Sequence, residues 1–410
     1  MRHIGIEYCP IRTPESDGLT ASTASPSVEM AQQGVDEARR AIAEAAVGDA
    51  ALFADLISLD AIGELALDGS TATVIVSLPI ADDGLRDRIE AELRNALEAV
   101  DGIESVRIGF DPEVADQRDR VDLLPTVKNV IAVSSGKGGV GKSTVAANLA
   151  ASLADCGLAV GLLDADIYGP NAPALLGAPD GSPATTSDAR IVPRDVHGVK
   201  VMSMDFIVGE DDPIIWRGPM VDDVLHQLTG DVDWGDLDYL IVDLPPGTGD
   251  AQLTLVQHLP VTGAVIVTTP QGVAVDDARR GLEGFAKYGV PILGVVENMH
   301  TFVCQDCGEE HAIFGSGGAD GLAEAFDIPV LGRIPLDPSV GSLEADDADP
   351  PGIDVPVIGR LSMPQTREER TGRLPPSALR EDGPVRTNLR RMATRVAARC
   401  QHAVVRSDED

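Results

Sequence analysis

The sequence predicts an α/β protein in which a mostly parallel sheet follows a small α+β domain. From residue 129 onward, short and continuously apolar segments alternate with helical stretches, as expected for strands buried on both faces. Before residue 112, the hydrophobic pattern indicates the element order αββαβ, with two extended segments around an Asp68-Gly69 turn. The chain has 410 residues, which is enough for two or three domains and a large buried core.

Changes in composition divide the chain into six segments. Residues 1–27, rich in Ser, Thr and Pro, are expected to form a flexible leader, and residues 28–112 the small domain. An acidic linker at 113–127 precedes the large domain at 128–338. Residues 339–384 form a low-complexity segment rich in Pro and Arg, and residues 385–402 a C-terminal helix.

Hydrophobic periodicity predicts the individual elements of both domains. In the small domain we expect helices at 28–46 and 82–100, and strands at 56–67, 71–78 and 106–110. In the large domain we expect strands at 130–133, 160–163, 200–204, 239–242, 264–268, 292–296 and 330–334. Ligands of such sheets bind at the carboxyl ends of the strands.

Composition and charge exclude several classes of protein. The net charge of −34 disfavours nucleic acid as a partner, because phosphate neutralisation dominates that affinity. Since the acidic excess runs along the whole chain, we interpret it as adaptation to a high-salt cytoplasm, as in a halophile. No apolar run approaches the ~18 residues of a membrane span, so we expect no stable membrane insertion. Five cysteines, and an N terminus without an apolar signal segment, favour a reducing, cytoplasmic location.

A phosphate-binding loop follows the strand expected at 130–133. It fits the pattern G-x-x-x-x-G-K-[ST] between a strand and a helix. Its backbone N–H groups and the helix N terminus would hold the phosphates, Lys142 would reach their β and γ oxygens, and Ser143 would bind Mg²⁺. The loop consists of Gly136, Lys137, Gly138, Gly139, Val140, Gly141, Lys142, Ser143 and Thr144.

Carboxylates end two of the buried strands. Asp164 and Asp166 follow the strand at 160–163, and Asp243 follows the strand at 239–242. Beside a phosphate-binding loop, such carboxylates are placed to hold Mg²⁺ or its waters, or to orient an attacking water.

Lys137 and a pair of cysteines both indicate a twofold homodimer. Lys137, directly after the first glycine of the loop, cannot easily fold back onto its own phosphates but can reach those of a partner docked face to face. Cys304 and Cys307, followed by Gly308, form a metal knuckle that supplies half of a four-thiolate site. A second subunit would supply the other half. Zinc remains a rival to an iron-sulfur cluster at this site.

The chain resembles the Mrp/ApbC family of iron-sulfur cluster carriers, within the deviant P-loop ATPases that include MinD and ParA. The small domain is similar to the iron-sulfur assembly-factor domain often fused to such proteins. The shared motifs, besides the G-K-G-G-x-G-K-[ST] loop, are Asp-Ala-Asp-Ile-Tyr-Gly-Pro-Asn at 164–171, Trp-Arg-Gly-Pro-Met at 216–220, Trp-Gly-Asp-Leu-Asp-Tyr at 234–239, Asp-Leu-Pro-Pro-Gly-Thr-Gly-Asp at 243–250, and Glu-Asn-Met at 297–299 with the following Cys-x-x-Cys.

The resemblance implies slow ATP hydrolysis and transfer of a 4Fe-4S cluster to apo-proteins. It implies that Lys137 acts across the dimer, Asp166 positions the water, and Asp164 touches a metal-bound water. Asp243 would be the Walker B acid, Gly247 the sensor of the γ-phosphate, and Asn298 an adenine contact. Pro335 and Asp337 would lie near the base.

Two other functions fit parts of the sequence. A MinD- or ParA-like positioning ATPase, acting on membrane or DNA, is supported by the last helix, although such a helix more often packs on its own domain. Its apolar face, surrounded by Arg390, Arg391, Arg395 and Arg399, comprises Leu389, Met392, Val396 and Cys400. A redox role like that of the nitrogenase iron protein is disfavoured, because cysteines are absent near residues 220 and 250.

Overall fold

The computed structural model describes most of the chain. Residues 26 and 27, at the end of the predicted leader, are helical. The rest of that leader, most of the linker and most of the low-complexity segment lie outside the described residues. Within the last of these, β13 (Gly352–Val355) and β14 (Gly359–Ser362) form an antiparallel hairpin that composition did not predict. The described residues are 26–45, 47, 56–112, 114, 124–166, 169–179, 181–203, 206, 228–247, 252, 255–257, 259–304, 307, 309–336, 352–355, 359–362 and 384–409.

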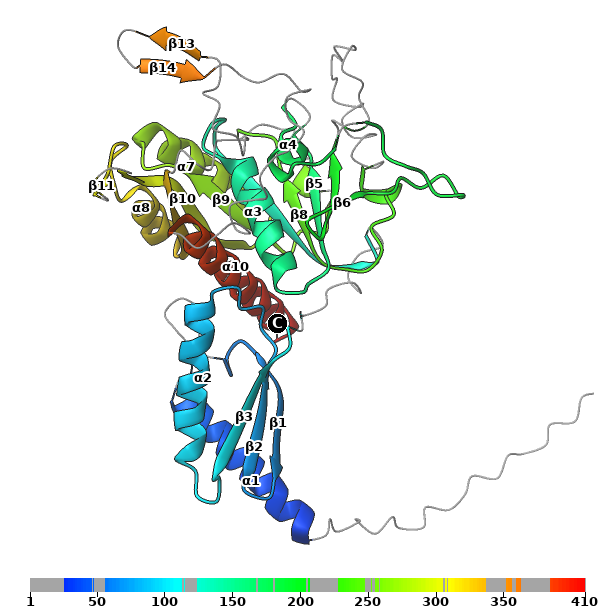
Figure 1. Ribbon diagram of the computed structural model, residues 1–410, viewed down its shortest axis with the longest axis vertical. Coiled ribbons are helices and arrows are strands. Elements are labelled where there is room, and N and C mark those ends of the chain that lie inside the picture. Colours follow the sequence, from blue (N-terminus) through cyan, green and yellow to red (C-terminus); the bar gives the residue numbers. More distant parts are fainter. Residues whose placement is uncertain are drawn as a thin grey trace, which may run out of the picture.

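The N-terminal elements form a three-stranded sheet with two helices against it (Figure 1). They are α1 (Pro26–Glu44), β1 (Ile62–Asp68), β2 (Thr71–Val76), α2 (Asp83–Glu98) and β3 (Ser105–Phe110). β1 pairs antiparallel with β2, and β2 pairs parallel with β3. Buried aliphatic side chains from both helices and the sheet form one hydrophobic core. Asp82 caps α2, because its carboxylate accepts a hydrogen bond from the Leu85 N–H at 3.1 Å.

The predicted strand at 56–67 is wrong in its first half. Residues 56–60 form turns, in which the Asp60 N–H donates to Ile57 O and the Ala61 N–H donates to Leu56 O. Leu56 and Leu59 are nevertheless fully buried. Buried leucines in a turn produce the same apolar pattern as a strand, so the sequence alone does not distinguish them.

The larger sheet is mixed but mostly parallel, with the strand order β11-β10-β9-β4-β8-β5-β7-β6, and β12 also pairs with β10. Among the described strand pairs of this sheet, only β6–β7 and β10–β11 are antiparallel. All seven strands expected in the large domain are present. The strands are β4 (Val127–Ser135), β5 (Val160–Asp164), β6 (Arg194–Val196), β7 (Val199–Ser203), β8 (Leu237–Asp243), β9 (Gly263–Thr268), β10 (Ile292–Val303), β11 (Glu310–His311) and β12 (Val330–Leu336).

Helices cover both faces of this sheet. The connections from β4 to β5 and from β9 to β10 run in opposite directions along the strand order, so right-handed crossovers place their helices on opposite faces. α3 (Lys142–Asp155) packs against the C-terminal helix, and α7 (Gly272–Lys287) packs against α8 (Gly318–Phe326). β4 lies in the middle of the sheet, so the phosphate-binding loop at its carboxyl end is surrounded by neighbouring strand ends.

The C-terminal helix α10 (Pro384–Glu409) is longer than the predicted 385–402 and packs on its own protein. Leu389, Met392, Val396 and Cys400 are buried in the core of the large sheet. Arg395 donates to the backbone carbonyl of Leu331 at 3.2 Å, and Arg399 donates to that of Leu293. The face proposed for a membrane or DNA is therefore already occupied. Among the described helices, none combines the length and apolarity needed to cross a bilayer.

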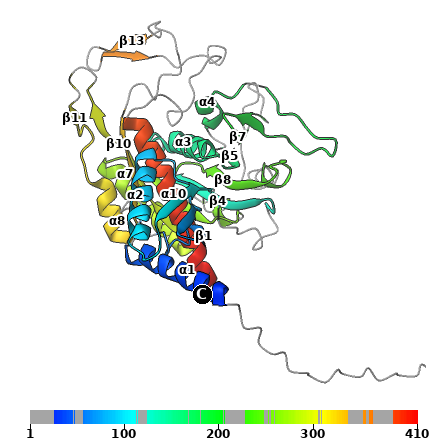
Figure 2. The same ribbon diagram turned by 60° about the horizontal axis from the view of Figure 1, so that its bottom comes forward.

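α10 also contacts the small domain. In Figures 1 and 2 it lies between α3 and α2. Arg391 pairs with the helix-capping Asp82 at 2.8 Å, and Arg390 pairs with Asp155 at the end of α3 at 3.0 Å. The buried Thr394 hydroxyl accepts a hydrogen bond from the Ala81 N–H at 2.8 Å. The same helix thus holds the N-terminal sheet against the large one.

We expect Thr394→Val to weaken this contact. Valine keeps the shape of threonine but leaves the Ala81 N–H without its acceptor, which costs about 1–3 kcal/mol of unfolding free energy. Chemical unfolding followed by circular dichroism measures the loss. Thr394→Ser is the control, since it keeps the hydroxyl; equal unfolding midpoints for the valine variant and the wild type would contradict the role of this hydrogen bond.

Candidate functional site

A cavity of about 320 Å³ opens at the carboxyl ends of β4, β5 and β8. The phosphate-binding loop forms one wall, and the segments after β5 and β8 form the others. It is lined by Ser135, Lys137, Gly138, Gly139, Gly141, Lys142, Ser143, Thr144, Asp166, Asn171, Ala174, Leu175 and Pro246.

Two glycines of the loop are required by its close packing. Gly141, which caps α3, has a φ of +86°, and a Cβ there would lie 2.1 Å from Nδ2 of Asn298. At Gly136, a Cβ would lie 2.2 Å from the backbone carbon of Asp277 in α7. The loop is therefore held between the end of β10 and α7.

Lys142 forms a buried ion pair with Asp243. Its Nζ lies 2.5 Å from Asp243 Oδ1 and 3.9 Å from Asp166 Oδ2, and it donates to the Ser143 hydroxyl at 3.4 Å. Burial raises the pKa of Asp243, while Lys142 and Ser143 counteract this shift. Asp243 Oδ2 is buried and has no hydrogen-bond partner among the described residues. A carboxylate oxygen without a partner, near the Ser143 hydroxyl, is suited to Mg²⁺ or to a water bound to it.

Asp164 holds the segment that follows β5. Its Oδ1 accepts the Asp166 N–H at 3.1 Å, and its Oδ2 accepts the Ala172 N–H at 3.0 Å and the Ser203 hydroxyl at 3.3 Å. Complete burial, together with the nearby Asp243, raises the pKa of Asp164 to about 8. Both oxygens already accept hydrogen bonds from the protein, so the structure indicates a positioning role. The predicted contact with a metal-bound water stays a prediction.

The other predicted nucleotide residues surround the same loop. The Gly247 N–H donates to Ser135 O at 2.9 Å, and Lys137 donates to the Gln271 side chain at 3.4 Å. Asn298 Nδ2 donates to Val140 O at 2.9 Å. Pro335 is buried in β12, one residue beyond the strand partner of Asn298. Asp337 lies outside the described residues, and the adenine contacts stay predictions.

The cysteine pair lies at the far end of β10. Cys304 directly follows this strand, and its N–H donates to Glu309 O at 3.0 Å, which closes a hairpin with β11. Cys304 is half-buried, Cys307 is exposed, and neither forms a disulfide. β10 therefore connects the loop-contacting Asn298 to the cysteines within a few residues.

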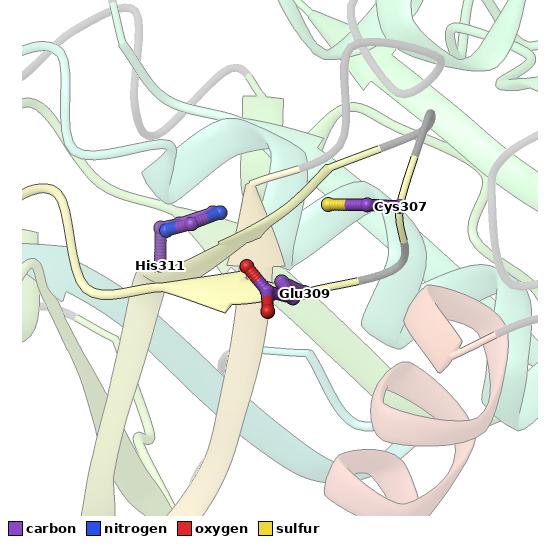
Figure 3. A group of neighbouring side chains, drawn as sticks. All are labelled: Cys307, Glu309 and His311. Carbon is purple, nitrogen blue, oxygen red and sulfur yellow. The ribbon is translucent and has the colours of Figure 1, made fainter.

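The sequence interpretation overlooked two features of this hairpin. Glu297, fully buried, accepts the Ala319 N–H at the start of α8 and contacts His300 Nδ1 at 2.5 Å. It thereby positions the end of β10. Cys307, Glu309 and His311 bring a thiol, a carboxylate and an imidazole together (Figure 3). The signal that the sequence offers is the occurrence of these three metal-binding residue types within residues 307–311.

A phosphate-binding loop between β4 and α3, with buried carboxylates ending β5 and β8, defines a P-loop NTPase. Residues 126–356 match the NUBPL iron-transfer P-loop NTPase family, and residues 36–110 match the iron-sulfur cluster assembly protein family. The chain belongs to the iron-sulfur cluster carrier family of P-loop NTPases. The family resemblance found in the sequence is confirmed, and the cluster-carrier interpretation is favoured over a positioning ATPase.

Individual relatives extend over most of the chain. An iron-sulfur cluster carrier protein of Synechocystis sp. is 45% identical over 326 residues, which are 78% of this chain and 90% of the relative. One from Deinococcus radiodurans is 49% identical over 72% of this chain and 83% of its own length. The solved ADP complex of a nucleotide-binding protein from Archaeoglobus fulgidus is 40% identical, with a TM-score of 0.48 over 53% of this chain and 86% of that chain.

Proposed function

We propose that the protein is an ATP-dependent carrier of a 4Fe-4S cluster, which two subunits hold between Cys304 and Cys307 of each chain and deliver to apo iron-sulfur proteins. One observation carries this proposal. β10 contacts the phosphate-binding loop through Asn298 and ends at the cysteines, so one strand, with an irregularity between Asn298 and Phe302, joins the nucleotide site to the thiols. The names of the relatives support the same cargo.

The proposed subunit arrangement follows from the cysteines. Two thiolates per chain are half of the four that such a cluster requires. Cys307 is exposed on the hairpin, so a twofold axis beside it would bring the partner's thiolates to the same cargo. Cys156, Cys304, Cys307 and Cys400 form no disulfides, which supports a reducing cytoplasm as the location.

Nucleotide binding would rearrange the charges in the cavity. Lys142 leaves Asp243 for the β and γ phosphates, because phosphate oxygens then compete for its ammonium group. Asp243 would thereby gain a second free oxygen and, with Ser143, would hold Mg²⁺ or its waters, which would supply positive charge beside the phosphates. Asp166, which lines the cavity, orients the attacking water. Gly247 can donate to the γ-phosphate once its N–H releases Ser135 O.

Changes at the phosphate-binding loop would reach the cluster through β10. Asn298 bonds the loop at Val140, and Glu297 next to it anchors the strand to α8. A shift of the loop therefore displaces the end of β10 and alters the distance between the cysteines of the two subunits.

We also propose that residues 28–112 and residues 128–338 form separate domains. Two hydrophobic cores, which meet along α10, support this division.

The cluster test compares cysteine variants after anaerobic purification and reconstitution with iron and sulfide. The wild type should hold about two irons per chain and activate an apo iron-sulfur enzyme, as one four-iron cluster per dimer implies. Cys304→Ser and Cys307→Ser should each lose the stable cluster and its visible absorption. Both should still bind ATP, because the phosphate-binding loop lies on other strands.

Cys156→Ser is the matched control, since Cys156 lies at the end of α3 and donates to Ser152 O. It should carry the cluster like the wild type. A colourless protein that holds stoichiometric zinc and cannot be reconstituted would refute the carrier function and indicate a zinc-bridged dimer.

The subunit arrangement is tested through Lys137. Lys137→Ala should keep ATP affinity, because the side chain contacts only Gln271 among the residues described around it, yet lose the concentration-dependent, dimeric part of ATP hydrolysis. Phosphate release measured over a range of protein concentrations checks this. Gln271→Ala removes the same hydrogen bond but keeps the charge of Lys137, so this variant should hydrolyse ATP at the wild-type rate. Hydrolysis by Lys137→Ala at the wild-type rate would exclude a role across the dimer.

A further inference from the structure

The cysteine hairpin carries a second set of metal-binding side chains within a single subunit. One ligand atom each from Cys307, Glu309 and His311 lies within 4.8 Å of the other two, and all three residues are exposed. In Figure 3 they gather around a common space beside the hairpin, Cys307 from the loop and the other two from or next to β11. Cys304 does not belong to this group.

The strand register explains why these residues meet. In the hairpin Phe302 pairs with His311, and Val303 pairs with Glu310. Side chains alternate between the two faces of a strand, so Glu309 and His311 share one face and Glu310 points to the other. Glu310 is also an exposed glutamate, but it lies outside the group.

The donor set suits a borderline divalent metal. A thiolate, a carboxylate and an imidazole are the three ligand types that zinc, ferrous iron and cobalt(II) share. Ligands at about 2.0–2.3 Å from a tetrahedral ion are roughly 3.3–3.8 Å apart, so the ligand atoms of these side chains need to approach one another by at most about 1.5 Å. Exposed side chains at the end of a hairpin achieve this by small rotations. Three protein ligands leave the fourth position open.

We propose that each subunit alone binds one divalent transition-metal ion, ferrous iron in a cluster carrier, through Cys307, Glu309 and His311. The choice of iron rests on the proposed function, whereas the site itself does not. Cys307 belongs both to this site and to the proposed bridging cluster, so the two cargoes exclude each other. A subunit would thus hold a single ion as a monomer and release Glu309 and His311 when a cluster takes Cys307.

Cobalt(II) is the probe for this site. It is titrated anaerobically into reduced, tag-free, metal-free protein, and visible absorption reports cobalt–thiolate bonds. We expect one ion per chain, bound equally at protein concentrations where the chain is monomeric. His311→Ala and Glu309→Gln should each weaken binding by roughly tenfold or more, since even outer ligands contribute that much. Cys307→Ser should abolish the cobalt–thiolate absorption.

Two controls separate this site from the bridging site. Glu310→Gln, on the opposite face of β11, should bind cobalt like the wild type. Cys304→Ser should also bind one cobalt per chain, although it should lose the iron-sulfur cluster. Binding at one ion per two chains, lost in Cys304→Ser and unchanged in His311→Ala and Glu309→Gln, would overturn the single-subunit site while leaving the cluster proposal intact. Normal cobalt binding in a protein that never holds a cluster would refute only the carrier function.

Discussion

Lys142→Ala should abolish ATP hydrolysis, with a loss of about 10²–10³-fold or more. Lys142 is the ammonium group beside the phosphate cavity, and removal of one such donor leaves the developing charge on the transferred phosphoryl group uncompensated. Steady-state phosphate release measures the effect. Lys128→Ala is a suitable control, because Lys128 on β4 pairs with Asp238 on β8 at 2.8 Å, at a partly exposed position away from the cavity. Equal turnover in Lys142→Ala and the wild type would contradict the ATPase assignment.

The same substitution should also destabilise the protein without nucleotide, because it leaves Asp243 buried without its cation. Loss of one partner of a buried pair costs about 3–5 kcal/mol. Burial then raises the pKa of Asp243 unopposed, so the folded state holds a proton that the unfolded state releases. The contribution of Asp243 to the stability of the variant is therefore fully present at pH values below the usual carboxyl pKa. It is lost as the pH rises through the raised pKa of the folded state. Thermal unfolding should show a deficit that grows with pH.

A second substitution separates these two effects. Lys142→Ala combined with Asp243→Asn should regain much of the lost stability, since the amide carries no charge, but it should not regain turnover. A deficit that is independent of pH, and unchanged in the double variant, would show that the ion pair is not its cause.

Asp166→Ala should bind Mg-ATP but hydrolyse it about 10²-fold more slowly, as expected when the attacking water is no longer oriented. The carboxylate lines the cavity, and its Oδ2 lies 3.9 Å from Lys142 Nζ. Its backbone N–H, which bonds Asp164, is kept in the variant, so the segment after β5 should remain in place. Slow hydrolysis should trap an ATP-bound dimer that sizing chromatography detects.

Asp166→Asn is the matched control for shape, because it keeps the size of the side chain and removes only its charge. It should hydrolyse as poorly as the alanine variant if the carboxylate acts on the water. Loss of ATP binding in both variants would instead make Asp166 a structural residue.

The sequence by itself determined the phosphate-binding loop and the strands that surround it. These features are local: a loop pattern between a strand and a helix, and continuous apolar runs that only a doubly covered sheet accommodates. The pairing of Val133 with Asp243 and Val265 shows that the loop and Asp243 follow neighbouring strands, so the carboxylate predicted at a strand end lies beside the loop. The Cys304-x-x-Cys307 spacing could be read for the same reason, since it involves only four consecutive residues.

Only the tertiary structure decided how distant residues meet. Lys142 and Asp243 are 101 positions apart, and Ala81 and Thr394 are 313 apart. No local pattern encodes such contacts, because they depend on strand order and on the helix that packs beside it. The amphipathic pattern of α10 likewise predicts an apolar face but not the surface that covers it. His311 lies near Cys307 because Cys307 is in the turn that leads into β11, and the strand position of His311 is fixed only once β11 has paired with β10.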